Sequence, residues 1–182
     1  NVYGGNDIAG RVEGTGVTSG TIVTVNLYGG TITGNVFGGG NGDYGCSNYS
    51  TGKYFESDES NTTAEEFVGN SDATFLTVPW VQSTVVNVEQ ASGKTLKVGT
   101  IYGGGNKAGI GLEGSTTGNS TINLTAGTIG YVYTGGRMAP IYSSATLNFT
   151  SGNKIHIEHD VYGGNDIANA TNGIKNCTVN VA

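Results

Sequence analysis

Apolar and polar residues alternate in short segments that recur along the whole chain. In Thr24-Val25-Asn26-Leu27, for example, Val25 and Leu27 fall on one face of an extended segment, and Thr24 and Asn26 fall on the other. A two-residue period of this kind predicts a β-strand with one buried face. Glycine pairs between the segments, such as Gly29-Gly30, favour turns. The pattern therefore predicts an all-β protein built from short strands.

Two motifs carry this pattern, and they follow one another in a fixed order. The first has a central asparagine, and it recurs at Asn26, Asn87, Asn123, Asn148 and Asn180. The second has an aromatic residue before a glycine-rich turn, and it recurs at Tyr3, Phe37, Tyr102, Tyr133 and Tyr162. The period is about 30 residues once segment 42–80 is set aside.

A unit of two short strands cannot bury a core alone, but stacked copies of that unit can. The repeats therefore predict a right-handed parallel β-helix, a β-solenoid of about five to six coils, with residues 1–182 as one domain and 42–80 as an inserted flap. Stacking would align the asparagines in one structural ladder and the aromatic residues in another. The alternative is an antiparallel sandwich or barrel, which does not account for the fixed order of the motifs.

The two ends of the repeat pattern complement each other. The chain begins with an aromatic motif and ends with an asparagine motif, and Val-Tyr-Gly-Gly-Asn-Asp-Ile-Ala occurs at both 2–9 and 161–168. Unpaired strand edges favour further pairing. The expected partner is thus the chain itself, stacked head to tail into filaments, or neighbouring repeats of a longer array.

The strings TVNLYGGTITGNVFGGGN (24–41) and IYGGGNKA (101–108) resemble glycine-rich repeats in large surface or secreted proteins of Bacteroidota. The resemblance extends over most of the chain outside 42–80. It implies an extracellular or cell-surface repeat protein, and it implies no particular ligand.

Segment 42–80 interrupts the period and is rich in aromatic and acidic residues. Loops inserted into repeat proteins often carry binding sites. Aromatic rings stack on sugar faces and carboxylates accept hydroxyl hydrogen bonds, so Tyr44, Tyr54, Phe55 and Trp80 are candidate residues for binding a glycan. The alternative is a flap whose apolar side chains pack on the wall of the domain.

Charge argues against nucleic acid as a partner, and the distribution of apolar residues argues against insertion into a membrane. The net charge is −6, with 8 Lys and Arg against 14 Asp and Glu. Nucleic-acid binding needs clusters of basic residues, and none occurs. A membrane span needs about 18 or more consecutive apolar residues, and the sequence has no such run. We therefore expect no nucleic acid as partner and no membrane insertion.

No set of residues in the sequence indicates an enzyme. Arg11 and Arg137 are the only arginines, and they belong to different repeats. His156, Glu158 and Asp160 alternate and would share one strand face, as a metal or acid–base site requires. The same alternation is typical of a solvated strand face. We predict no catalytic residues, no metal site and no cofactor.

Two smaller features leave alternatives open. Cys46 and Cys177 are predicted to be free or buried thiols, or a disulfide if the fold brings them together. Asp7, Asp43 and Asp166 follow glycine-rich turns, where aspartate more often bonds its own backbone than calcium. The sequence as a whole predicts an extracellular structural protein, a segment of a stalk, fibre or adhesin.

Overall fold

Strands and turns make up the part of the chain that the computed structural model describes. This part comprises residues 1–7, 11–12, 23–42, 44–48, 53–56, 80–111, 116–150, 154–167 and 173–182. It contains no helix. For Arg11, 44–48 and 53–56, the description covers the backbone only.

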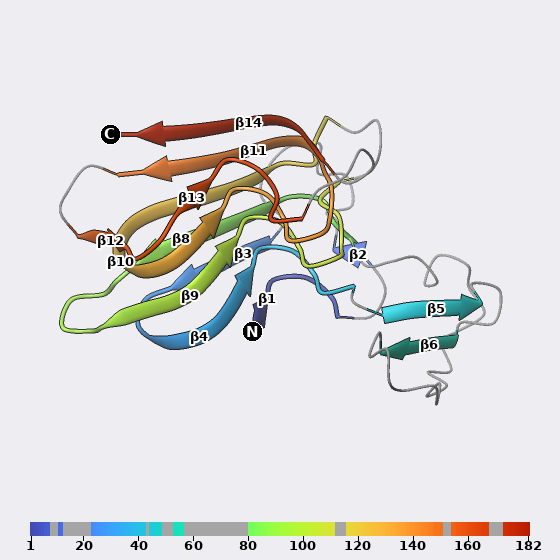
Figure 1. Cartoon of the computed structure of the whole chain (residues 1–182), viewed down its shortest axis with the longest axis horizontal. Helices are drawn as coiled ribbons and strands as arrows, with labels where there is room; N and C mark the ends of the chain where they lie inside the picture. Colours follow the sequence, from blue (N-terminus) through green and yellow to red (C-terminus); the bar gives the residue numbers. More distant parts are fainter. Residues whose placement is uncertain are drawn as a thin grey trace.

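Ten of the described strands form one parallel sheet that curls into a half-barrel (Figure 1). The long strand β10 (Ser120–Tyr133) crosses the middle of this sheet, and its two halves pair with different neighbours. We call the two parts of the sheet the Asn limb and the aromatic limb. The Asn limb consists of β3 (Val23–Leu27), β8 (Thr84–Glu89), residues 120–126 of β10, β11 (Ile141–Phe149) and β14 (Ile174–Val181). The aromatic limb consists of β1 (Val2–Tyr3), β4 (Gly30–Phe37), β9 (Leu96–Tyr102), residues 127–133 of β10, β12 (Ile155–Ile157) and β13 (Val161–Tyr162).

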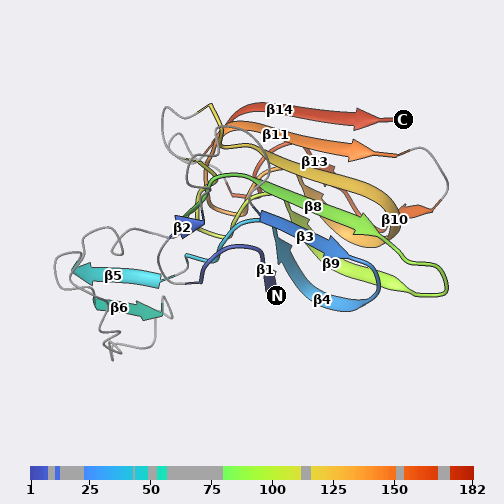
Figure 2. The same cartoon turned by 180° about the vertical axis from the view of Figure 1, so that it is seen from behind.

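Two small sheets accompany the main one. β2 (Arg11–Val12) and β7 (Trp80–Val81) pair in parallel. β5 (Tyr44–Asn48) and β6 (Lys53–Glu56) pair antiparallel, and they lie to one side of the main sheet in both views (Figures 1 and 2). The β5–β6 pair lies within the segment predicted to be an insertion.

The predicted β-solenoid of five to six coils is wrong, because the strands of both motifs belong to one continuous sheet. The β-solenoid prediction assigns the asparagine strand and the aromatic strand to separate faces of a coil. In the structure β10 passes through both motifs without a break. Hydrogen bonding therefore continues from one limb into the other, and the sheet curls into a half-barrel (Figure 2).

The bend in β10 occurs where the chain changes limbs. Ala126 is the last residue that pairs with β8, and Gly127 is the first that pairs with β12. Gly127 has a φ of 132°, a conformation that residues with a side chain rarely adopt. Glycine at this position lets the strand turn the corner while its backbone stays paired.

Side chains from both limbs fill the inside of the half-barrel and form one apolar cluster. Val86, Ile122 and Leu147 occupy equivalent positions on neighbouring strands of the Asn limb, and each is fully buried. Val98 and Ile129 are equivalent and buried on the aromatic limb. Because the pairing is in register, the apolar residue of each repeat lies next to its counterparts. Burial of these side chains is the main stabilising contribution.

Glycine allows close approach where most of the aromatic strands run into their turns. A side chain at Gly38 would collide with the carbonyl oxygen of Gly103, and one at Gly103 would collide with that of Thr134. The same positions donate backbone hydrogen bonds to the neighbouring strand, from Gly38 to Tyr102 (2.9 Å) and from Gly103 to Tyr133 (3.1 Å). The Gly-Gly pair that follows Tyr3, Phe37, Tyr102 and Tyr162 therefore allows these turns to stack as closely as the strands, and Thr134 takes the first glycine position after Tyr133.

We expect Leu147→Ala to lower the free energy of unfolding by about 2–5 kcal/mol, because it opens a cavity in the filled interior. Thr146→Ala is the matched control, since Thr146 is the preceding residue on the opposite, half-exposed face of β11. That control is expected to change the unfolding free energy by less than about 0.5 kcal/mol. Equal effects of the two substitutions in urea denaturation would contradict the assignment of the two faces.

Candidate functional site: side-chain ladders and open sheet edges

Five asparagines form a hydrogen-bonded line across the outer face of the Asn limb. Register pairing places Asn26, Asn87, Asn123, Asn148 and Asn180 side by side on β3, β8, β10, β11 and β14. Neighbouring side-chain amides are joined by hydrogen bonds of 2.8–2.9 Å. We call this line the Asn ladder. It brings together the five asparagines predicted from the sequence.

The Asn ladder has a direction. Asn180 donates from Nδ2 to Oδ1 of Asn148, and every later asparagine likewise donates to the earlier one, down to Asn26. Asn26 therefore uses its Oδ1 within the ladder and keeps an amide N–H₂ donor at the β3 edge. Asn180 uses its Nδ2 and keeps an Oδ1 acceptor at the β14 edge. The two edges carry complementary hydrogen-bonding groups.

A second line, the aromatic ladder, crosses the aromatic limb. The rings of Tyr3, Phe37, Tyr102, Tyr133 and Tyr162 are stacked with centroids 4.7–5.0 Å apart and interplanar angles of 3–14°. Offset stacking at this separation is a favourable arrangement of aromatic rings. Phe37 and Tyr102 are buried, whereas Tyr162 at the last position is 42% exposed. One face of the Tyr162 ring has its neighbour, Tyr133, and the other faces the open edge.

Burial and neighbouring carboxylates raise the pKa of three tyrosines of this ladder. Tyr102 donates from its hydroxyl to Oδ2 of Asp166 at 2.9 Å. Burial raises the pKa of Tyr102, and the hydrogen bond and negative charge of Asp166 raise it further. The pKa of Tyr133 is raised by burial and by Asp166, and that of Tyr162 mainly by the charge of Asp160. The phenols are therefore neutral hydrogen-bond donors rather than acid–base groups at neutral pH.

A third line of side chains follows the glycine turns, and we call it the turn row. Its members occupy the same position after each aromatic residue, and they are Asp7, Asn41, Asn106, Arg137 and Asp166. Asn41 donates to Oδ1 of Asp7 at 2.9 Å, Asn106 donates to Asn41 at 2.8 Å, and Arg137 donates to Asn106 at 3.2 Å. As in the Asn ladder, Asn41, Asn106 and Arg137 each donate to the earlier member.

The turn row was not predicted as a unit, although its positions can be read from the sequence. Its members differ in residue type, and only the constant distance from the aromatic residue relates them. The sequence identifies Asp7 and Asp166 only as aspartates that follow glycine-rich turns. The structure shows that they occupy equivalent places at the two ends of one row.

The strand at the C-terminal edge of the sheet exposes residues that are buried elsewhere. Val179 and Val181 of β14 are 40% and 78% exposed. Val179 pairs with Leu147 on β11, and Leu147 pairs with Ile122 on β10. Both of these residues are fully buried. β14 pairs on one side only, with β11, among the described residues. At the opposite edge, β3 pairs only with β8 within the described ranges of the chain.

The candidate glycan-binding residues are not brought together by anything that the structure describes. Trp80 lies in β7 beside the backbone of Arg11 and is partly exposed. The side chains of Tyr44, Tyr54 and Phe55 lie outside the described residues. Glycan binding by this group stays a prediction.

The alternating His156, Glu158 and Asp160 lie on a solvated surface. All three are exposed, while Ile155 and Ile157 pack against the core from the opposite face of β12. Lys97 forms an ion pair with Glu158 at 2.7 Å, and this lysine lowers the pKa of the Glu158 carboxyl. In the part of the chain that the structure describes, no three His, Cys, Asp or Glu residues are grouped as a metal site requires.

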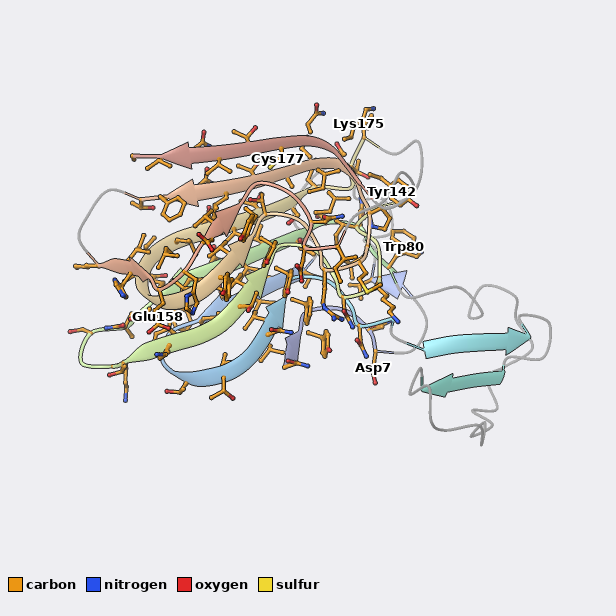
Figure 3. The ribbon with its side chains drawn as sticks, in the orientation of Figure 1. Asp7, Trp80, Tyr142, Glu158, Lys175 and Cys177 are labelled. Carbon is orange, nitrogen blue, oxygen red and sulfur yellow. The ribbon has the colours of Figure 1, made fainter. Side chains whose placement is uncertain are left out.

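The remaining predicted residues are dispersed. Arg137 belongs to the turn row, and the side chain of Arg11 is outside the description. Cys177 is a free thiol on β14 whose pKa is raised by burial, and the side chain of Cys46 and the whole of Asp43 are outside the described residues. Figure 3 shows Cys177 and Asp7 near opposite edges of the sheet.

Comparison with known proteins adds no assignment to this geometry. The chain matches no protein-family model, and it is similar to no curated protein and to no solved structure. Among the described residues, no helix has the length and apolar character needed to cross a membrane. The arrangement is therefore interpreted from its own contacts. These are three rows of side chains, two of which have a hydrogen-bond direction, and two open edges.

We expect Asn123→Ala to destabilise the fold by about 1–3 kcal/mol, because it removes two ladder hydrogen bonds, each worth roughly 0.5–1.5 kcal/mol. Thr121→Ala provides the control, since Thr121 lies on the same face of β10 but outside the Asn ladder. Urea denaturation measures both. If the Asn ladder contributes nothing to stability, the two variants will have the same unfolding midpoint, which would contradict the prediction.

Proposed function

We propose that this protein is a structural repeat protein that assembles head to tail, the β14 edge of one copy pairing with the β3 edge of the next. The observation that carries the proposal is the polarity of the Asn ladder. Asn180 presents an acceptor at one edge, and Asn26 presents a donor at the other. A second copy placed in register would form the same hydrogen bond that joins the asparagines within the chain.

The residues of the two edges match along their length. With Asn180 opposite Asn26, the alignment pairs Thr178 with Thr24, Val179 with Val25 and Val181 with Leu27. Each residue of β14 would thus pair with the residue at the equivalent position of the repeat in β3. β10 and β11 pair in the same way within the chain. The exposed apolar groups of β14 would be covered, at a gain of very roughly 1.5 kcal/mol per buried valine.

The aromatic limb supports the same alignment. Tyr162 offers an uncovered ring face at one edge and Tyr3 stands at the other end of the ladder. Within the chain, the residue after each aromatic donates its backbone N–H to the next aromatic carbonyl, as from Thr134 to Tyr162 at 3.0 Å. By the same rule, Gly163 would donate to Tyr3 of the second copy.

A head-to-head dimer fits less well. Two β14 edges facing each other would bring the Asn180 acceptors together and would pair the strands antiparallel, whereas every pairing in the main sheet is parallel. A repeating head-to-tail contact that does not close forms a filament. We infer that such a filament serves outside the cell as a stalk, fibre or adhesin, an inference that the resemblance to surface repeat proteins supports.

We expect Val179→Lys to prevent assembly, because it places a charge where the interior of the half-barrel continues across the junction. The matched control is Thr178→Lys, which places the same charge on the outer face of the same strand. Sedimentation velocity is the measurement. The wild-type protein and the control should form large assemblies, and Val179→Lys should remain monomeric.

A monomeric wild-type protein at all concentrations would contradict pairing between copies, and it would leave a neighbouring repeat of a longer chain as the occupant of the edge. Assembly of Val179→Lys to the wild-type extent would show that the contact does not involve β14.

A further inference from the structure

The glycine-rich turns stack on one another most closely at the second residue after each aromatic residue. This position is occupied by Gly5, Gly39, Gly104, Gly135 and Gly164. A methyl carbon at Gly5, Gly39 or Gly104 would lie 2.7–2.9 Å from a backbone nitrogen of the next turn along the sheet. None of the five glycines has a positive φ. Close approach of the next turn, rather than backbone conformation, is therefore what requires glycine at the inner positions.

Gly164 differs from the other four, because turn 161–166 is the last of the described turns along the sheet. No described atom lies within 4 Å of a methyl carbon placed at Gly164. Gly39, Gly104 and Gly135 are buried, whereas Gly164 is half-buried. Within the described part of one copy, neither lack of space nor backbone conformation requires glycine at this position.

The backbone of turn 161–166 is open on the same side. In an inner turn both residues of the glycine pair donate their N–H groups to the next turn, as from Gly38 to Tyr102 (2.9 Å) and from Gly39 to Gly104 (3.1 Å). The N–H groups at 163 and 164 meet no such acceptor in the described part of the chain. The last turn therefore presents two backbone donors beside a position that has room for another turn.

The chain carries a turn of matching sequence at its opposite edge. Residues 2–7 and 161–166 are both Val-Tyr-Gly-Gly-Asn-Asp. Turn 161–166 stacks on turn 132–137, and Gly135 donates its N–H to the carbonyl oxygen of Gly164 at 3.1 Å. Residues 2–7 of a second copy can therefore occupy, relative to 161–166, the place that 161–166 occupies relative to 132–137.

We propose that the open turn 161–166 is the recognition surface of the head-to-tail contact, and that it fits the identical turn 2–7 of a second copy because Gly164 has no side chain. The proposal rests on the proposed head-to-tail function and names the residue that determines its specificity. By the rule of the inner turns, Gly164 would donate to the carbonyl oxygen of Gly5 in the second copy. The backbone of Asn6 would then lie directly against Gly164, as the backbone of each inner turn lies against the glycine of the turn before it.

The test is Gly164→Ala, which adds a methyl group that would meet a second copy but no described atom of its own copy. The urea midpoint of unfolding, measured below the critical concentration for assembly, should be unchanged or slightly higher, because alanine restricts the unfolded chain. The critical concentration, measured by sedimentation, should rise by about tenfold or more, because the methyl group would overlap the backbone of the second copy.

Two substitutions of the same kind serve as controls. Gly104→Ala places the methyl carbon at the equivalent position of an inner turn, 2.9 Å from Cα of Gly136, so this variant should have a lower urea midpoint. Gly109→Ala places it in ordinary contact with the ring of Pro140, at 3.4 Å. This second control should unfold and assemble as the wild type does.

A mixing experiment tests which end of the molecule is blocked. A Gly164→Ala copy keeps its own turn 2–7, so it can add to the 161–166 end of a wild-type filament, and the next copy then cannot add to it. A small fraction of this variant should therefore shorten wild-type filaments seen by electron microscopy. The same fraction of Gly109→Ala should leave their length unchanged.

Assembly of Gly164→Ala at the wild-type critical concentration would overturn the proposal, while leaving head-to-tail pairing of β14 with β3 intact. A lowered urea midpoint in this variant would overturn it as well, because Gly164 would then be covered within its own copy. Wild-type filaments of unchanged length in the mixture would contradict a block at one end. A wild-type protein that stays monomeric at every concentration would instead refute the proposed function itself.

Discussion

Parallel pairing in register is the constraint on which the rest of this structure depends. It places each residue beside its counterpart in the neighbouring repeat, so that Asn123 meets Asn87 and Asn148, and Tyr102 meets Phe37 and Tyr133. An asparagine can donate and accept at the same time, and an aromatic ring can stack on both faces. Residues of these kinds are stable next to copies of themselves, whereas a row of carboxylates would not be. In-register pairing thus selects the residues of the ladders.

The same constraint gives the molecule a polarity. Amide hydrogen bonds in the Asn ladder and the turn row run from the later strand to the earlier one. A directional row must end in a donor at one edge and an acceptor at the other. The edges of the sheet are therefore different surfaces, and the ends of the Asn ladder complement each other.

The sequence predicts the local structure better than it predicts the curvature of the sheet. Alternation in Thr24-Val25-Asn26-Leu27 is enough to place an outward asparagine on a strand, because side chains alternate along extended backbone. How the strands join depends on the bend at Ala126-Gly127, where one glycine conformation lets β10 remain paired around a corner. The periodic pattern of apolar and polar residues does not indicate this bend. The β-solenoid prediction is wrong because it does not include a strand that continues through the bend. The turn row was not predicted because its Asp, Asn and Arg residues share only their distance from the aromatic residue and differ in type.

Electron cryomicroscopy of the assembled protein tests the central claim most directly. The account predicts filaments in which β14 of each copy pairs in parallel with β3 of the next. Asn180 and Asn26 would be adjacent, and the strand spacing of about 4.8 Å would continue unbroken across the junction. Filaments joined through β14 to β14, or particles that remain single, would contradict it.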